Sequence, residues 1–139
     1  MKPYRILVVE DDPNISELIK ITLMSPPYVI TCVDSGTAAL AKIAEENPDL
    51  VVLDILIPEP DGWKLYAMIR SDPALAHIRI LILTALITKW DGLKKKNILP
   101  ADGYMTKPFN LDELRKKVME LLECQAVHEH EDFSQPCPL

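Results

Sequence analysis

The chain has 139 residues, which is enough for one compact domain with a real hydrophobic core but too few for two domains of ordinary size. Apolar residues make up 48% and charged residues 26%, as in ordinary soluble globular proteins. The net charge of -6 argues against broad binding to nucleic acid or docking on an anionic membrane, because both need a basic surface. The scattered cysteines, Cys32, Cys124 and Cys137, form no zinc or CxxC spacing, which predicts reduced thiols and a cytoplasmic location. The apolar runs are too short for a membrane span, and the N-terminus does not have the form of a signal peptide.

Strands and helices alternate from the N-terminus onward. Tyr4–Val9 is a short, β-branched apolar run and predicts a strand. Asp12-Pro13 has the N-cap and first-position proline of a helix, which Ser25-Pro26-Pro27 ends. Tyr28–Val33 predicts the second strand, and Ser35 is the expected cap of the helix that follows.

The middle of the chain repeats this pattern. Asn47-Pro48 ends the second helix, and Leu50–Ile57 predicts the most apolar strand, interrupted only by Asp54. A loop over Pro58–Gly62 leads into a third helix, which Asp72-Pro73 ends.

The last third is less regular. Ile78–Leu83 predicts a fourth strand, and a short helix is expected within Leu86–Leu99, where the apolar spacing is irregular. Tyr104–Thr106 predicts a short fifth strand, and Asn110 begins a final amphipathic helix with a pattern like a capping box. The expected domain covers residues 1–123. Residues 124–139 lose the helical period and contain prolines and acids, so a flexible tail is expected there.

This alternation predicts an α/β fold with a doubly wound, five-stranded parallel sheet and five helices, since parallel strands are covered on both faces. In such sheets the ligand site lies at the carboxyl ends of the strands. Glu10 and Asp11, Asp54, Thr84 and Lys107 each lie at or near such an end, so we expect them in one crevice.

Several carboxylates that close together disfavour one another's ionisation unless a cation neutralises them. Mg²⁺ prefers oxygen ligands and commonly uses one or two carboxylates together with phosphate oxygens. An aspartate in such a site can act as a nucleophile toward a phosphoryl group, with Lys107 and Thr84 facing its oxygens. No GxxxxGK[ST] loop is present, so the phosphoryl group is expected to come from another molecule.

The segments ILVVEDDP, PDLVVLDILIPEPDG, LILTA and YMTKPF, in this order and spacing, resemble the receiver domain of bacterial response regulators over about residues 4–123. The resemblance implies the flavodoxin-like strand order 2-1-3-4-5. It also implies that Asp54 is the phosphoacceptor. Glu10 and Asp11 match the acidic pair that binds Mg²⁺, with Asp11 favoured as the direct ligand, and Leu56 matches the position that offers a backbone carbonyl to the metal.

The same resemblance gives Thr84 the role of switch hydroxyl, Tyr104 that of switch aromatic, and Lys107 that of site lysine, often followed by a cis bond to Pro108. It implies phosphoryl transfer from a phosphohistidine on a sensor histidine kinase or a histidine phosphotransfer protein. The expected protein is a stand-alone receiver, not an enzyme in the usual sense, that signals to a partner protein and does not bind nucleic acid or membrane. The sequence departs from the family pattern in the short helix expected within Leu86–Leu99, where Trp90 and Lys94–Lys96 lie.

The alternative is a receiver-fold protein-binding module that is not phosphorylated. A haloacid-dehalogenase-type enzyme also uses a nucleophilic aspartate, but that class needs a second aspartate where Leu56 stands.

Overall fold

The computed structural model describes residues 3–24, 28–58, 60–84 and 103–130, with side chains described as far as residue 122 and without that of Thr84. Five parallel strands form one sheet in the order β2-β1-β3-β4-β5, as the sequence predicted. The strands are β1 (Tyr4–Val9), β2 (Tyr28–Val33), β3 (Leu50–Asp54), β4 (Arg79–Thr84) and β5 (Gly103–Thr106). The helices are α1 (Pro13–Leu23), α2 (Gly36–Glu46), α3 (Gly62–Ser71) and α5 (Leu111–His130), with a short 3-10 turn, η1, over Pro73–Leu75.

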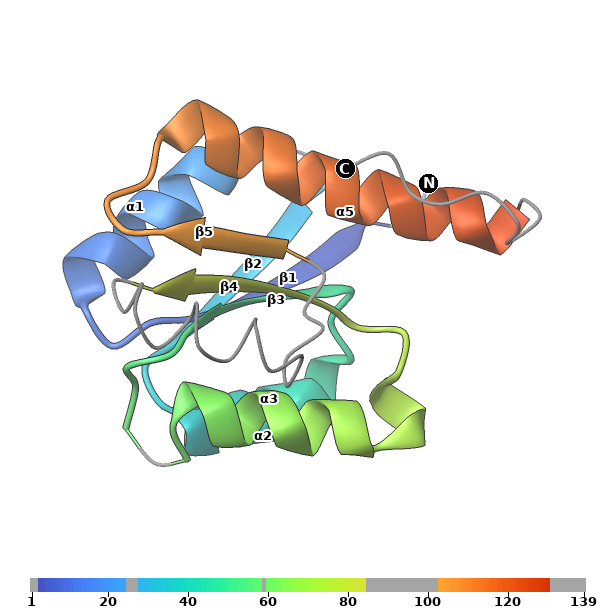
Figure 1. Ribbon diagram of the computed structural model, residues 1–139, viewed down its shortest axis with the longest axis horizontal. Coiled ribbons are helices and arrows are strands. Elements are labelled where there is room, and N and C mark those ends of the chain that lie inside the picture. The colour runs from blue at the N-terminus through green and yellow to red at the C-terminus, as the bar shows by residue number, and fades with distance from the viewer. Residues whose placement is uncertain (1–2, 25–27, 59, 85–102, 131–139) are drawn as a thin grey trace, which may run out of the picture.

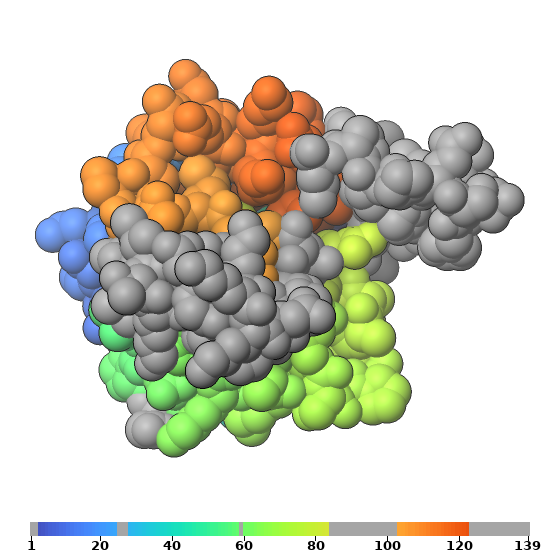
Figure 2. Space-filling view, viewed as in Figure 1, coloured from blue at the N-terminus to red at the C-terminus, as the bar shows by residue number. Residues whose placement is uncertain are grey.

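Helices cover both faces of the sheet. Helices α1 and α5 lie on one face and α2 and α3 on the other (Figure 1). The space-filling view shows the described residues of β5 and α5 in orange on one side and those of α3 in green on the other (Figure 2). Alternate residues along each strand therefore enter different cores, as expected for strands buried on both faces.

Each face of the sheet has its own hydrophobic core. The α1/α5 core includes Ile6, Val8, Ile19, Leu50, Val52, Leu81, Leu114 and Val118. The α2/α3 core includes Leu7, Val9, Ile43, Val51, Leu53, Leu65, Ile69 and Ile82. The core residues of β1 and β3 are almost completely shielded from solvent, so the sheet edge that they lead to is rigidly supported.

Helix starts follow the sequence signals. Asp12 Oδ1 accepts hydrogen bonds from the Asn14 and Ile15 amides at 2.9 and 3.4 Å, and Ser35 Oγ accepts one from the Ala38 amide at 3.1 Å. Caps of this kind satisfy amides that have no partner within the helix. The predicted caps of the first two helices are therefore confirmed.

The last helix begins in the same way, because Asn110 Oδ1 accepts from the Asp112 and Glu113 amides at 2.8 and 3.1 Å.

The bounds of β4 and β5 differ from the sequence prediction by one residue, and two other element boundaries differ by more. Strand β3 ends at Asp54 instead of Ile57, because the Asp54 carboxylate accepts the Leu56 amide at 3.0 Å and turns the chain there. Helix α5 continues to His130, although the apolar period is lost at Cys124. Alanine, glutamate and glutamine in this segment favour helix without needing a buried face. The tail expected over 124–139 stays a prediction, and the helix expected within 86–99 lies outside the described residues.

Among the described residues, none of the helices combines the length and the apolar character that crossing a membrane requires.

Candidate functional site

Strand register brings the predicted site residues to one edge of the sheet. Val8 of β1 pairs with Val52 of β3, so Glu10 and Asp54 follow at the same level, two residues further along each strand. Val8 and Val52 both enter the α1/α5 core, and the period of two along a strand sends Glu10 and Asp54 toward the same side. The fold therefore places two carboxylates from neighbouring strands beside each other.

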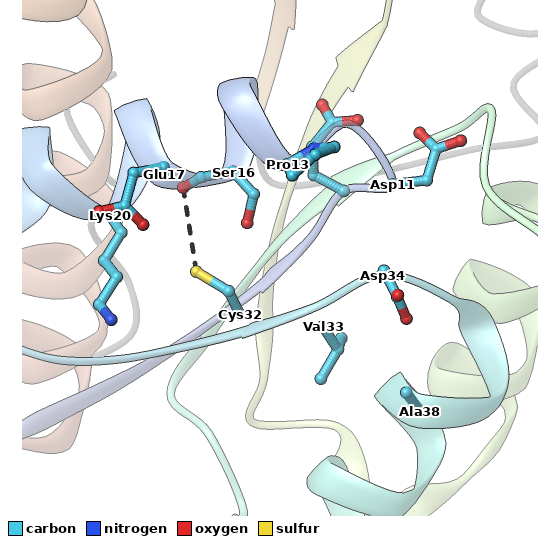
Figure 3. A pocket seen from close by; sticks show the side chains of 10 residues that line it. Asp11, Pro13, Ser16, Glu17, Lys20, Cys32, Val33, Asp34 and Ala38 are labelled. Atoms are coloured by element: carbon cyan, nitrogen blue, oxygen red, sulfur yellow. Dashed lines mark hydrogen bonds between the residues drawn. The ribbon is translucent and has the colours of Figure 1, made fainter.

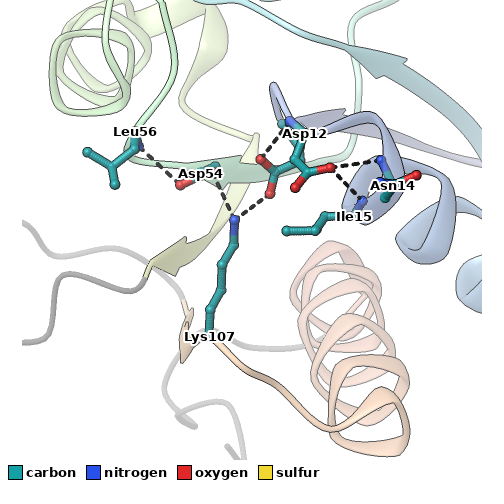
Figure 4. Close-up of polar contacts among 7 residues, drawn as sticks. Asp12, Asn14, Ile15, Asp54, Leu56 and Lys107 are labelled. Carbon is teal, nitrogen blue, oxygen red and sulfur yellow. Dashed lines mark hydrogen bonds and ion pairs between the residues drawn. The ribbon is translucent and has the colours of Figure 1, made fainter.

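The lysine reaches the same place from β5. Asp54 is level with Leu83 of β4, and Leu83 is level with Met105 of β5, so Lys107 lies just beyond this level. Its side chain extends across the end of β4 toward Asp54 (Figure 4). The bond between Lys107 and Pro108 is cis, as the family resemblance implied.

The three side chains form one charged cluster. Lys107 Nζ lies 2.9 Å from Asp54 Oδ2 and 2.5 Å from Glu10 Oε1. Glu10 and Asp54 are only 3% and 5% exposed, so both carboxylates are buried. A single ammonium group thus bridges two buried acids, and charge-assisted bonds of this kind are among the stronger hydrogen bonds in proteins.

Asp11 completes an acidic group. Carboxylate oxygens of Glu10, Asp11 and Asp54 all lie within 4.8 Å of one another, and Asp11 is the exposed member. In the described part of the chain this is the one set of three acidic, histidine or cysteine side chains that could hold a metal ion. The donors are all carboxylate oxygens, which suit Mg²⁺ and not the softer metals that favour histidine or thiolate.

Asp12 lies beside this group, but its side chain caps a helix. Its carboxylate caps α1, and its backbone amide donates to Glu10 Oε2 at 3.2 Å. Adjacent acids are thus divided between holding the helix and forming the cluster, as the sequence predicted for Asp12.

Burial and neighbouring charges shift the pKa values of Glu10 and Lys107. Burial, with the neighbouring Asp54 carboxylate, raises the pKa of Glu10 from 4.5 to about 7, although Lys107 acts in the opposite direction. Burial alone would lower the pKa of Lys107, but hydrogen bonds to Glu10 and Asp54 raise it above 10.5. The lysine is therefore a fixed positive charge, whereas Glu10 changes its charge near neutral pH.

The remaining predicted residues have these places. The Leu56 amide donates to Asp54 Oδ1 at 3.0 Å, and its side chain is 54% exposed next to the cluster. Thr84 is the last residue of β4 and is level with Thr106, but its side chain lies outside the described residues. Tyr104 is half-buried in β5 and packs against the α2/α3 core. The switch roles of Thr84 and Tyr104 and the metal contact of the Leu56 carbonyl stay predictions.

A groove of about 670 Å³, with both polar and apolar lining residues, leads from the cluster to solvent between α1 and the end of β2. Asp11 lies at one end, and Glu17, Lys20, Cys32 and Asp34 lie along it (Figure 3). The Cys32 thiol is directed at the Ser16 carbonyl oxygen, 3.9 Å away. Glu10 and Asp11 both line this groove, so an ion can reach the acidic group from solvent.

Sequence reasoning missed two features of the site. The short contact between Lys107 and Glu10 was not foreseen, since the lysine was assigned only to the acceptor and its phosphoryl group. The packing of the segment around Gly36 against the loop after Asp54 was also missed, and no signal beyond the glycine itself points to it.

Comparisons with known proteins agree with this geometry. The family model described as "Response regulator receiver domain" matches residues 6–119. The chain therefore belongs to the response regulator receiver family, a class of signalling proteins in two-component systems.

Individual relatives support the same assignment. The chain is 36% identical over 118 residues to the DNA-binding dual master transcriptional regulator RpaA of Synechocystis sp.. This match covers 85% of the present chain and 48% of RpaA. The chain is also 37% identical over 122 residues to histidine kinase P4 of Formosa agariphila. That match covers 85% of the present chain and 8% of the kinase. The crystal structure of response regulator protein TrrA from Thermotoga maritima, in complex with Mg(2+)-BeF, has 41% identity and a TM-score of 0.73. The match covers 88% of this chain and all of that one.

The chain thus spans about half the length of RpaA and a small part of the kinase. Receiver domains occur in both settings, so the activities of the whole relatives do not transfer to this chain directly.

Proposed function

We propose that this domain accepts a phosphoryl group on Asp54 in a Mg²⁺-dependent reaction and transmits the change to a partner protein. The observation that carries the proposal is the cluster itself, in which Lys107 Nζ lies 2.9 Å from Asp54 Oδ2 beside a group of three carboxylates. A purely structural ion pair would not need a third, exposed acid at Asp11, and charges buried without a role are costly.

The metal would be held by Asp54, Asp11 and Glu10, with the backbone carbonyl of Leu56 as a further ligand. When bound, Mg²⁺ neutralises the acids and draws charge from the phosphoryl oxygens. Burial, together with the neighbouring Asp54 carboxylate, raises the pKa of Glu10 to about 7, and a bound cation would favour the charged form of this acid.

The residues of the chain then have defined parts in the transfer. The Asp54 carboxylate is oriented by the Leu56 amide on Oδ1 and by Lys107 on Oδ2. One of its oxygens attacks the phosphorus atom of a phosphohistidine, forming an acyl phosphate as the bond to the imidazole nitrogen breaks. Lys107 and the hydroxyl of Thr84 donate hydrogen bonds to the phosphoryl oxygens. Water later hydrolyses the acyl phosphate and restores the carboxylate.

The donor is a sensor histidine kinase or a histidine phosphotransfer protein. Output follows from a two-state equilibrium in which Thr84 approaches the phosphoryl group and Tyr104 turns inward, so that the surface around β5 and α5 changes. The stand-alone reading, with a protein as the output partner, stays a prediction. Immunoblotting the protein from its native cells tests it, because a band well above the 139-residue mass would reject it.

The decisive test is phosphorylation of the purified protein. With acetyl phosphate and Mg²⁺, intact-mass spectrometry is expected to show one added phosphoryl group. Removing Mg²⁺ with EDTA before acetyl phosphate is added should prevent this gain in mass. Asp54→Asn should abolish the added mass. Asp12→Asn is the matched control, because asparagine is an equally good N-cap and the substitution removes a neighbouring acid without touching the acceptor. No added mass in the wild-type protein would favour the alternative, a receiver-fold binding module that is not phosphorylated.

A further inference from the structure

The corner between β2 and α2, residues Val33–Gly36, contacts both loops that form the acidic site. The Val33 carbonyl oxygen accepts a hydrogen bond from the Glu10 amide at 3.0 Å, at the start of the loop that carries Glu10 and Asp11. Three residues later, the Gly36 amide donates to the Pro58 carbonyl oxygen at 3.2 Å, in the loop that follows Asp54. None of the corner residues belongs to the group of three carboxylates, yet the corner joins the two segments that supply them.

Gly36 fits this corner only because it has no side chain. A Cβ atom at Gly36 would lie 2.0 Å from the Pro60 carbonyl oxygen and 2.8 Å from Cγ and Cδ of the Pro60 ring. The glycine does not have a positive φ angle, so the need is for space and not for an unusual backbone conformation. Because the nearest atom belongs to the backbone, any side chain at this position would displace the loop itself.

The described parts of the loop, on either side of residue 59, have little freedom to absorb such a displacement. Ile55 and Ile57 are 2% and 7% exposed and are anchored in the α2/α3 core. At the end of the loop, the Gly62 amide donates to the Ile55 carbonyl oxygen at 3.0 Å, and a Cβ at Gly62 would lie 2.5 Å from the Ile55 Cα. Close-packed segments transmit strain instead of absorbing it, so a shift at Pro60 is passed through the neighbouring Gly62 to Ile55.

Leu56 is where that shift reaches the site. It lies between the two buried isoleucines, and its amide holds Asp54 Oδ1 at 3.0 Å. A change in the course of the loop therefore moves the Leu56 backbone relative to Asp54, while Glu10 stays tied to Val33 on the other side.

We infer that Gly36 is a positioning residue of the acidic site, which sets the spacing between Asp54 with its loop and the Glu10–Asp11 segment through the β2–α2 corner. The part of this inference that concerns metal binding rests on the proposed function. The part that concerns the loop is independent of any metal. The group that gains from the correct spacing is a divalent cation shared among the three carboxylates.

The test substitutes Gly36→Ala and compares it with Ala44→Gly. Ala44 is exposed in the same helix, so its replacement lowers stability through helix propensity without touching the loop. Three quantities are measured under conditions where both variants are folded: stability in urea, Mg²⁺ affinity by titration calorimetry, and hydrogen exchange of the Leu56 amide without metal.

Gly36→Ala is expected to weaken Mg²⁺ binding by roughly tenfold, the lower end of what lost support around a metal site costs. It should also speed exchange of the Leu56 amide in the metal-free protein. Ala44→Gly should leave both unchanged even where its loss of stability is as large. Equal Mg²⁺ affinity and equal exchange in Gly36→Ala and wild type would overturn the inference while leaving the proposed function intact.

Pro60→Gly tests the same contact from the opposite side and serves if Gly36→Ala does not fold. Removing the ring and loosening the backbone should weaken Mg²⁺ binding several-fold and speed Leu56 exchange, and unchanged values would again overturn the inference. If the wild-type protein neither binds Mg²⁺ nor takes up a phosphoryl group, the proposed function fails. The exchange rate of the Leu56 amide then decides the positioning role by itself.

Discussion

Replacing Lys107 with methionine removes the ammonium group that bridges Glu10 and Asp54 but keeps most of the side-chain volume. The two carboxylates left behind have side chains that are only 2% and 6% exposed, so water cannot take the place of the lost charge. The resulting loss of stability is expected to depend strongly on pH, since one of the two acids can avoid the problem by binding a proton.

The size of the effect follows from the ionisation of Glu10. At about pH 8, above the Glu10 pKa of about 7, the wild-type protein holds Glu10 in its charged form beside Lys107. The variant must either leave buried charge unpaired or keep a proton on Glu10 that the solution would remove, at a cost of up to about 3–5 kcal/mol. At about pH 5.5, below the Glu10 pKa of about 7, the acid is protonated in the folded state, and the loss should be about 1.5–3 kcal/mol for the remaining charged hydrogen bond.

The sign follows from proton linkage. Lys107 lowers the pKa of Glu10, so its removal raises the folded-state pKa further above the ordinary value of 4.5 that applies when the chain is unfolded. The folded variant then holds a proton that the unfolded chain releases, and its stability falls as pH rises through this window.

Urea unfolding of wild type and Lys107→Met at the two pH values measures the difference. Lys116→Met, at an exposed position of α5, is the control for loss of one lysine. Saturating Mg²⁺ should recover much of the loss at the higher pH, because the ion binds the folded state only. An equal loss at both pH values, or a larger loss at the lower one, would refute the proposed charge balance.

Three further predictions concern other parts of the site. Because the pKa of Glu10 is raised to about 7, Mg²⁺ affinity should fall below that pH by up to roughly tenfold per unit as protons compete, and titration calorimetry on Glu10→Gln should show a flatter profile. Leu56→Asn should speed loss of the phosphoryl group, since a polar side chain replaces an exposed apolar one beside Asp54. Following the intact mass over time measures this loss, with Leu56→Met as the apolar control. An unchanged rate of decay in Leu56→Asn would reject the idea. Asp12→Ala should lower stability by about 1 kcal/mol through loss of the α1 cap and leave Mg²⁺ affinity unchanged; weaker Mg²⁺ binding would instead place Asp12 among the ligands.

Much of the fold was predictable because local signals and the sheet rule agree. Proline and asparagine positions fix the ends of the first helices, and β-branched runs fix β1 and β2, so both strands have the predicted bounds. Because ligand sites in such sheets lie at the carboxyl ends of the strands, Glu10, Asp54 and Lys107 stand out from the other charged residues of the sequence. The structure brings these three side chains into contact.

The differences have physical causes that a linear pattern does not contain. Strand β3 was predicted three residues too long because Ile55 and Ile57 are as apolar as strand residues, whereas the turn depends on a side-chain bond of Asp54 to its own backbone. The helical segment after Cys124 has no apolar period, so a prediction based on periodicity ends α5 too early. The Gly36 contact depends on a close approach of two loops distant in sequence, which no local signal reports.

Among the side chains that the structure describes, the sheet divides the interior into two hydrophobic cores that have no member in common. A substitution in one core, such as at Ile43 of α2, and one in the other, such as at Val118 of α5, have separate neighbours, so their effects on stability should add. Within either core the effects should couple. Each layer can therefore diverge in its own way while the strands between them keep the charged edge in place.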